Sequence, residues 1–282
     1  MVGGREHIPI VTSNYQIGKL KGRKPTSAQL CKHQDGKYYI HIQLKDNAPK
    51  PINATNVIGI DLGRTDLAYT SQDQKWSGKE IRDVRDKYSR VRASIQKKAS
   101  KGTRSSRRRC RKLLKRLSGK ERRFQRHINH VISKTVVADA LKTNSIIALE
   151  DLTGIREDTN QKPRTKTERR RSNSWAFFQL RQFIEYKGIT KGIETYAVPP
   201  AYSSLSCHKC LHLGLRSGKK FKCANSNCQW SGDADHNASR VLAIIGGVVS
   251  LLRGSDSLSC TLDSGLLKCH RNLAKANERS VL

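Results

Sequence analysis

The chain has 282 residues, enough to bury a hydrophobic core, and we expect one main domain with a smaller annex. Its 55 Lys and Arg against 23 Asp and Glu give a formal net charge of +32, which exceeds what solubility requires and predicts a polyanionic partner, foremost nucleic acid. A membrane-spanning role is not expected, because the longest apolar segment, residues 241–252, is interrupted by two glycines and a serine and is too short to cross a bilayer.

The first residues of the chain contain no hydrophobic signal segment. We therefore expect a cytoplasmic protein that associates with the nucleoid. In that compartment the eight cysteines should be free thiols or metal ligands, because disulfides are rare there.

Residues 1–55 predict a few antiparallel strands without a core of their own. Polar and apolar residues alternate over 38–44, after an Asp35-Gly36 turn, which is typical of a half-buried strand. Pro49-Lys50-Pro51 indicates a linker. We interpret this part as residual amino-terminal strands that lean on the main domain or on a missing portion.

The apolar run of residues 57–60 lacks alternation and ends in Asp61, which predicts a strand buried on both faces. An ionised carboxylate at such a place needs a partner, because removing it from water costs several kcal/mol. A metal ion is one candidate, and a cap on the turn at Gly63 is the other. Residues 66–70 predict a second strand in a hairpin with the first.

A long helical zone is predicted from Lys79 onward. Residues 97–126 contain 15 Lys or Arg and one acid, Glu121. Apolar residues recur every three or four positions, which predicts a helix pair, broken near Ser118-Gly119, with one packed and one cationic face; they are Leu113, Leu117, Phe124, Ile128, Val131 and Ile132. A solvated face is the alternative, although solvated helices normally mix charges of both signs. The phosphate-binding candidates are Arg104, Arg107, Arg108, Arg109, Arg111, Lys112, Lys115, Arg116, Arg122, Arg123 and Arg126.

A second buried strand is predicted at 145–152, and it also ends in an acid, Glu150. A third acidic segment, Asp233 to Asp235, opens an amphipathic helix. Three core elements that each supply a carboxylate favour a metal site over structural acids. Two-metal phosphodiester hydrolysis needs such carboxylates, and hard oxygen ligands select magnesium or manganese.

Residues 154–174 are rich in basic residues and poor in apolar ones, which indicates a mobile basic loop over the site; a linker without a role is the alternative. Its nucleic-acid-binding candidates are Lys166, Arg169, Arg170 and Arg171. Helical periodicity returns from Trp175, and residues 195–198 predict a short strand.

The most specific local pattern is a set of two close cysteine pairs, Cys207-x2-Cys210 and Cys223-x4-Cys228, separated by 12 residues. Four thiolates at this spacing predict a structural zinc ribbon. The last spacing is looser than the usual x2, and His208 and His212 are possible substitute ligands. The remaining cysteines, Cys31, Cys110, Cys260 and Cys269, lack such spacing and are expected to be ordinary thiols.

These motifs, in this order, resemble the RuvC motifs and inserted zinc ribbon of the transposon-encoded TnpB (OrfB) proteins, relatives of type V CRISPR nucleases. The resemblance covers residues 56–245 and rests on 59–63, 149–152, the four cysteines and 233–239. It implies an RNase H-like α/β fold, with a mixed sheet and flanking helices, in a magnesium-dependent endonuclease that an RNA from the element's end guides to DNA. It also implies that Asp61, Glu150 and Asp235 bind the magnesium, with Asp235 preferred to Asp233.

The resemblance divides the chain into residual strands (1–55), a nuclease core with the basic helices (56–202), a zinc ribbon (203–232), the helix of the last motif (233–247) and an unassigned tail (248–282). Family members usually carry a longer amino-terminal part. A truncated nucleic-acid-binding remnant or regulator with weak cleavage is therefore the main alternative, and a structural RNA-binding zinc-ribbon protein is a third. A supporting role in transposition and DNA recombination is expected, because no tyrosine nucleophile site is present.

Overall fold

A computed structural model describes residues 7–33, 35–152, 165, 176–199 and 203–253, and the chain divides into two compact units, 1–49 and 50–282. The first unit contains helix α1 (Asn14–Leu20) and an antiparallel pair of strands, β1 (Pro25–Lys32) and β2 (Tyr38–Leu44). Strand β2 agrees with the predicted strand. No described residue of this unit is buried, as expected for a part without its own core.

The centre of the second unit is a mixed five-stranded sheet with the strand order β5-β4-β3-β6-β7. Strand β3 runs parallel to β6, and β6 runs parallel to β7, whereas β3, β4 and β5 form an antiparallel meander. The bounds are β3 (Asn56–Asp61), β4 (Asp66–Thr70), β5 (Lys75–Ser77), β6 (Ser145–Glu150) and β7 (Thr195–Val198).

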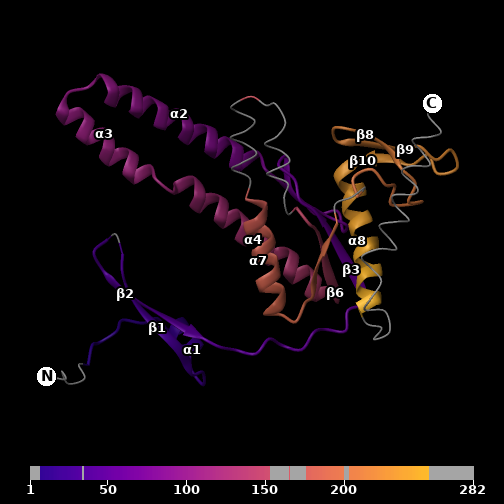
Figure 1. Cartoon of the computed structure of the whole chain (residues 1–282), viewed down its shortest axis with the longest axis horizontal. Helices are drawn as coiled ribbons and strands as arrows, with labels where there is room; N and C mark the ends of the chain where they lie inside the picture. Colours follow the sequence, from indigo (N-terminus) through magenta and orange to yellow (C-terminus); the bar gives the residue numbers. More distant parts are fainter. Residues whose placement is uncertain (1–6, 34, 153–164, 166–175, 200–202, 254–282) are drawn as a thin grey trace. The chain divides into compact units, whose positions relative to one another are not determined.

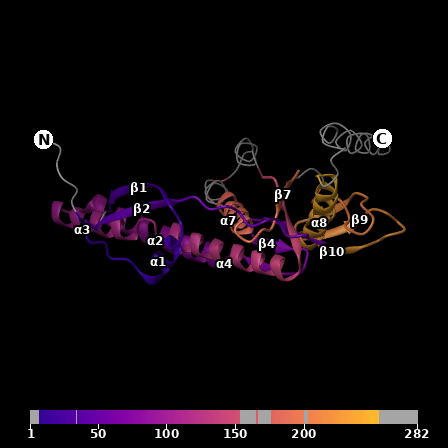
Figure 2. The same ribbon diagram turned by 90° about the horizontal axis from the view of Figure 1, so that it is seen from below.

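Helices cover both faces of this sheet (Figures 1 and 2). Helices α4 (Lys120–Lys142) and α7 (Phe177–Ile189) pack on one face, where Ile58 and Ile60 join the main hydrophobic core. Helix α8 (Ala234–Arg253) packs on the other face, against Val57 and Ala148. Because side chains alternate along a strand, odd-numbered residues of β3 and even-numbered residues of β6 point toward α8.

The basic region consists of three helices instead of the predicted pair. Helix α2 (Lys79–Lys101) ends before Gly102, α3 (Arg104–Leu117) folds back along α2, and α4 then begins after Gly119 (Figure 1). The predicted break near Ser118-Gly119 is confirmed, and Gly119 has a left-handed φ of 75°. The predicted packing face is wrong in part, because Leu113 and Val131 are 43% and 45% exposed.

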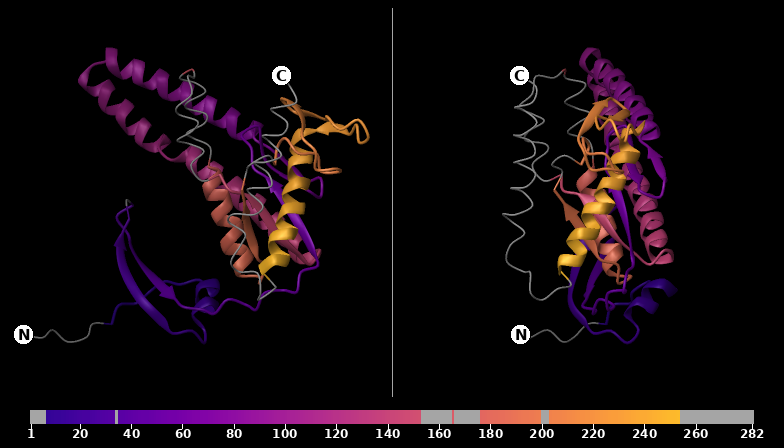
Figure 3. Two further views of the ribbon diagram at one scale, coloured as in Figure 1. Left: turned by 45° about the vertical axis from the view of Figure 1, so that its right-hand side comes forward. Right: turned by 90° about the vertical axis from the view of Figure 1, so that its right-hand side faces the viewer.

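The four-cysteine segment forms a small three-stranded antiparallel sheet of β8 (Gly214–Ser217), β9 (Lys220–Cys223) and β10 (Ser231–Asp233). Its small core contains Cys207, Phe221 and Cys223. Strand β10 leads directly into α8, so this sheet lies beside the beginning of that helix (Figure 3). Helix α8 continues to Arg253, past the predicted end at residue 247. No helix within the described part of the chain is long and apolar enough to span a membrane.

Candidate metal centres and nucleic-acid interface

Asp61 and Glu150 end two neighbouring parallel strands. The register pairs Ile60 of β3 with Leu149 of β6, so the two acids follow side by side at the same edge of the sheet. The residues that precede them, Ile60 and Leu149, belong to the main hydrophobic core on the face away from α8. Because side chains alternate along a strand, Asp61 and Glu150 point toward the face that α8 covers. The strand pattern therefore places both carboxylates at the end of the sheet face that α8 covers.

The third acid arrives on α8, which crosses that face in close contact with β3. A Cβ atom on Gly59 would lie 2.0 Å from the carbonyl oxygen of Ser239, so no larger residue fits beneath the helix. Asp233 caps the helix, since its Oδ1 accepts hydrogen bonds from the backbone N–H groups of Asp235 (2.9 Å) and His236 (3.1 Å). Asp235 itself is 5% exposed in the first turn, near the strand ends.

The three acids interact electrostatically. Burial raises the pKa of Asp61 to about 7, with further contributions from the negative charges of Glu150 and Asp235. Burial also raises the pKa of Glu150 to about 7, against a hydrogen bond from Ser203 and the positive charge of Arg216. A bound cation stabilises the ionised form of buried carboxylates. Because all of the donors here are carboxylate oxygens, the site fits magnesium or manganese.

Two cations from the β8–β9 hairpin contact this acidic site. Arg216 Nη2 lies 2.9 Å from Asp235 Oδ1, and Lys219 donates to Asp235 Oδ2. Lys219 also donates to Asp66, a buried acid at the start of β4. Sequence reasoning missed all three of these residues, because the Lys219–Asp66 contact joins positions 153 apart in the chain and neither belongs to a periodic pattern.

The four cysteines come together as the spacing predicted. Their sulfurs all lie within 4.8 Å of one another, with 3.8 Å between Cys207 and Cys228 and 3.4 Å between Cys210 and Cys223. A tetrahedral ion with metal–sulfur distances of about 2.3 Å needs sulfurs about 3.8 Å apart, so the cluster can hold zinc. Among the described residues these cysteines are the group whose ligand atoms all lie within 4.8 Å of one another, and the carboxylates of Asp61, Glu150 and Asp235 do not.

The pKa values of the clustered cysteines are shifted in different directions: burial raises the pKa of Cys207 and raises that of Cys223 to about 12. Although burial opposes it, the N–H of His212 and the neighbouring thiols stabilise the thiolate of Cys210 and lower its pKa to about 6. Neither His208 nor His212 joins the cluster among the described residues. Instead, Nδ1 of His208 lies 3.0 Å from Asn237 Oδ1, and Nδ1 of His212 lies 3.1 Å from the carbonyl of Cys210.

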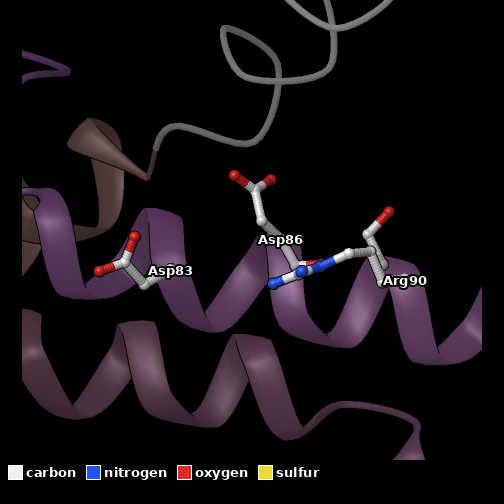
Figure 4. A pocket seen from close by; sticks show the side chains of 4 residues that line it. Asp83, Asp86 and Arg90 are labelled. Atoms are coloured by element: carbon white, nitrogen blue, oxygen red, sulfur yellow. The ribbon is translucent and has the colours of Figure 1, made fainter.

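The basic helices present their cations to solvent. All of the predicted phosphate-binding residues between positions 104 and 126 are at least partly exposed. The earlier part of α2 differs, because Asp83 and Asp86 lie along it with Arg90 around a shallow pocket (Figure 4). No acidic residue follows Asp86 in the sequence until Glu121, so the most basic stretch begins after this part of α2. The predicted loop residues Lys166, Arg169, Arg170 and Arg171, with most of residues 154–174, lie outside the described residues.

Comparisons with known proteins agree with this architecture. Residues 37–153 match the model of a family described as a probable transposase, OrfB_IS605, and residues 177–242 match the model of the Cas12f1-like TNB domain. The fold and these two matches define the class of transposon-encoded OrfB proteins and their Cas12f-like relatives. TnpB-like protein MJ0751 of Methanocaldococcus jannaschii is 32% identical over 235 residues, which are 80% of this chain and 82% of that relative. The chain belongs to the TnpB family.

More distant relatives are longer. CRISPR-associated endodeoxyribonuclease Cas12f1 of Sulfoacidibacillus thermotolerans is 30% identical over 80% of this chain, which spans 54% of that relative. A cryo-EM structure of a CRISPR-Cas12f ternary complex has a TM-score of 0.54 at 18% identity over 81% of this chain and 47% of that one. A Cas12f1-sgRNA-target DNA complex has a TM-score of 0.52, also at 18% identity, over 78% of this chain and 65% of that one. These two structures show likeness of fold alone.

Proposed function

We propose that this protein is a transposon-associated endonuclease that hydrolyses phosphodiester bonds in DNA with magnesium and is guided by an RNA from the element's end. The observation that carries this proposal is the placement of Asp61, Glu150 and Asp235 around one end of the sheet, where burial raises the pKa of the first two and the negative charges of Glu150 and Asp235 add to the rise at Asp61. The membership in the TnpB family and the names of the Cas12f relatives support the same activity.

In this proposal the second unit is an RNase H-like (RuvC) core with an inserted zinc ribbon. The parallel pair β3 and β6 with the antiparallel strand β4 supports the first part. The four-cysteine cluster on a small antiparallel sheet supports the second. The zinc is structural, because it ties the two turns that hold the β8–β9 hairpin beside the acids.

The carboxylates of Asp61, Glu150 and Asp235 hold the divalent cations. When bound, such cations supply activation of the attacking water and neutralisation of the leaving oxygen. The chain positions them: β3 and β6 fix two acids by register, and the cap of Asp233 fixes the first turn of α8, which carries the third. Because the face is covered by a packed helix, the acids stay in place before any cation arrives.

The exposed Lys and Arg of α3 and of the beginning of α4 bind phosphates of the nucleic acid. Such contacts release counterions and carry little sequence preference. The predicted candidates Lys166, Arg169, Arg170 and Arg171, which lie outside the described residues, bind phosphates as well in this proposal. The partners are thus a target DNA and a guide RNA, and the solved Cas12f1-sgRNA-target DNA complex, which is named for the same two kinds of nucleic acid, supports this choice.

The test is a cleavage assay with the purified chain, RNA transcribed from the end of its own element, and DNA that carries the matching sequence. We expect magnesium-dependent cleavage that Asp61→Ala abolishes, with nucleic-acid binding nearly unchanged. Lys142→Ala, which removes one surface charge at the end of α4, is the control and should cleave normally. Binding without cleavage in the parent protein would support the nucleic-acid-binding remnant instead.

A further inference from the structure

The turn of the β8–β9 hairpin brings a lysine onto a candidate catalytic acid. Ser217 pairs with Lys220, so the hairpin turns over two residues, Gly218 and Lys219. Gly218 has a φ of +58°, the left-handed conformation that two-residue hairpin turns require and glycine adopts most readily. The carbonyl of Lys219 accepts a hydrogen bond from the N–H of Ala234 (2.8 Å), which ties the turn to the start of α8.

The ammonium of Lys219 lies between two acids. It donates to Asp66 and to Asp235, which are both 5% exposed, while the lysine side chain itself is 41% exposed. Lys75 lies 3.2 Å from the same oxygen of Asp66 and gives that acid a second counter-ion. Burial acts to raise the pKa of Asp66, but the bonds from Lys219 and Lys75 outweigh it and keep the pKa below its usual value.

The hairpin therefore occupies both oxygens of Asp235. Arg216 Nη2 contacts Oδ1, and Lys219 Nζ contacts Oδ2. A divalent cation that binds Asp235 must share these oxygens with positive groups or displace one of them, because like charges in contact repel strongly in a partly buried place. Lys219 has a second carboxylate partner, because it also donates to Asp66. It can therefore release Asp235 and still keep an ion pair.

From this geometry we propose that Lys219 is a built-in competitor of the divalent cation: it neutralises Asp235 in the metal-free protein and moves fully onto Asp66 when the cation binds. This inference rests on the proposed metal site. Its consequence is that cation binding is coupled to the position of the β8–β9 hairpin, through the one lysine that both acids share. The intrinsic affinity for the cation is lowered by the free energy needed to remove Lys219 from Asp235.

The test is a titration of the intact, nucleic-acid-free protein with Mn²⁺, followed by the EPR signal of the free ion. We expect Lys219→Met to tighten Mn²⁺ binding by about fivefold, the upper end for one partly exposed ion pair. Lys219→Arg keeps the charge and should bind as the parent does. Lys75→Met is the matched control, because it removes a lysine from Asp66 that does not touch Asp235, and it should change the affinity by less than about twofold.

A second variant tests the same idea in the opposite direction. Asp66→Asn removes the alternative anchor, so Lys219 should stay on Asp235 and Mn²⁺ binding should weaken. Unchanged affinity in Lys219→Met, or equal effects of Lys75→Met and Lys219→Met, would overturn the inference. Mn²⁺ binding that survives the double variant Asp61→Asn, Glu150→Gln would instead mean that the proposed metal site is wrong, so the two failures are distinguishable.

Discussion

Gly59 lies directly against the backbone of Ser239, because a Cβ atom added to it would come within 2.0 Å of the serine carbonyl. The contact continues one turn later, where the same atom would lie 2.4 Å from the N of Ala243. A helix and a strand that meet at backbone distance cannot slide without a clash. This contact therefore fixes where the first turn of α8, with Asp235, meets the end of β3, with Asp61.

Two adjacent glycines of α8 give a matched test of this packing. A Cβ on Gly246 would lie 2.4 Å from the Cβ of Ala148, whereas a Cβ on Gly247 would make an ordinary contact of 3.6 Å with Val57. We expect Gly246→Ala to lower the free energy of unfolding by about 1–3 kcal/mol through overpacking. Gly247→Ala should raise it by up to about 1 kcal/mol, because alanine favours the helix. Urea unfolding of both variants measures the difference, and equal effects would mean that α8 does not press on the sheet.

The raised pKa values of Asp61 and Glu150 predict a pH-dependent stability. An acid with a raised pKa in the folded state binds its proton more tightly there than in the unfolded chain, so the free energy of unfolding falls as pH rises from about 4 to about 7. In buffer without divalent cations we expect a loss on the order of 2 kcal/mol between about pH 5 and pH 7.5. Urea unfolding at the two pH values measures it.

The variant Asp61→Asn should remove a large part of this pH dependence. Asp66→Asn is the control, because the pKa of Asp66 is lowered and the stability that it contributes is lost only as pH falls below about 4. It should leave the slope between pH 5 and pH 7.5 as it is in the parent. A parent protein that is equally stable at both pH values would show that burial does not raise the pKa of these two acids.

The cysteine cluster should contain one zinc ion per chain. Elemental analysis of protein purified without chelators checks this, and Cys210→Ser should lower the ratio well below one. Removal of zinc should unfold the small sheet, since binding contributes about 10–16 kcal/mol in zinc-finger peptides at neutral pH. Cys31→Ser changes a free cysteine of the first unit and should keep the zinc. A ratio near zero zinc ions per chain in the parent protein would show that the four cysteines do not hold zinc.

The exposed arginines of α3 should bind phosphates without sequence preference. Replacing Arg107, Arg108 and Arg109 by Ala should weaken binding equally on unrelated duplexes, because each lost phosphate contact removes about 0.9 from the slope of log affinity against log salt. The slope should flatten by up to about three. A binding titration at several salt concentrations measures it.

A charge-matched triple variant on α2 serves as the control for this measurement. Arg85, Arg90 and Arg92 contact Gln125, the Asp86 carbonyl and Glu121 respectively, so they are already engaged within the protein. Their replacement by Ala should change the salt slope less than the α3 variant does. Should the α3 variant keep the parental slope, the cationic run would be a solvated face.

Much of the fold follows from local pattern. The bounds of β2, β4 and β7 match the predicted strands residue for residue, because alternation or a buried run between turn residues is a strong signal. The acids Asp61 and Glu150 could be placed at one sheet edge for the same reason. Helix α1 was missed although Ser13 and Gln16 form a capping box, a local signal that was available in the sequence.

The features that sequence reasoning missed depend on contacts between distant segments. Asp66 looked like the first residue of a hairpin strand, and nothing near it indicates that Lys219, 153 positions later, is its partner. The exposure of Leu113 shows the same limit, since helical periodicity predicts a face but not whether another element covers it. Tertiary contacts decide both.

The central claim is that Asp61, Glu150 and Asp235 hold divalent cations together. Anomalous diffraction from crystals of the intact protein grown with Mn²⁺ tests it most directly. We predict one or two manganese peaks at the end of β3 and β6, each within about 2.5 Å of oxygens from at least two of these carboxylates. Manganese found only elsewhere, or carboxylates that point to opposite faces of the sheet, would contradict the account.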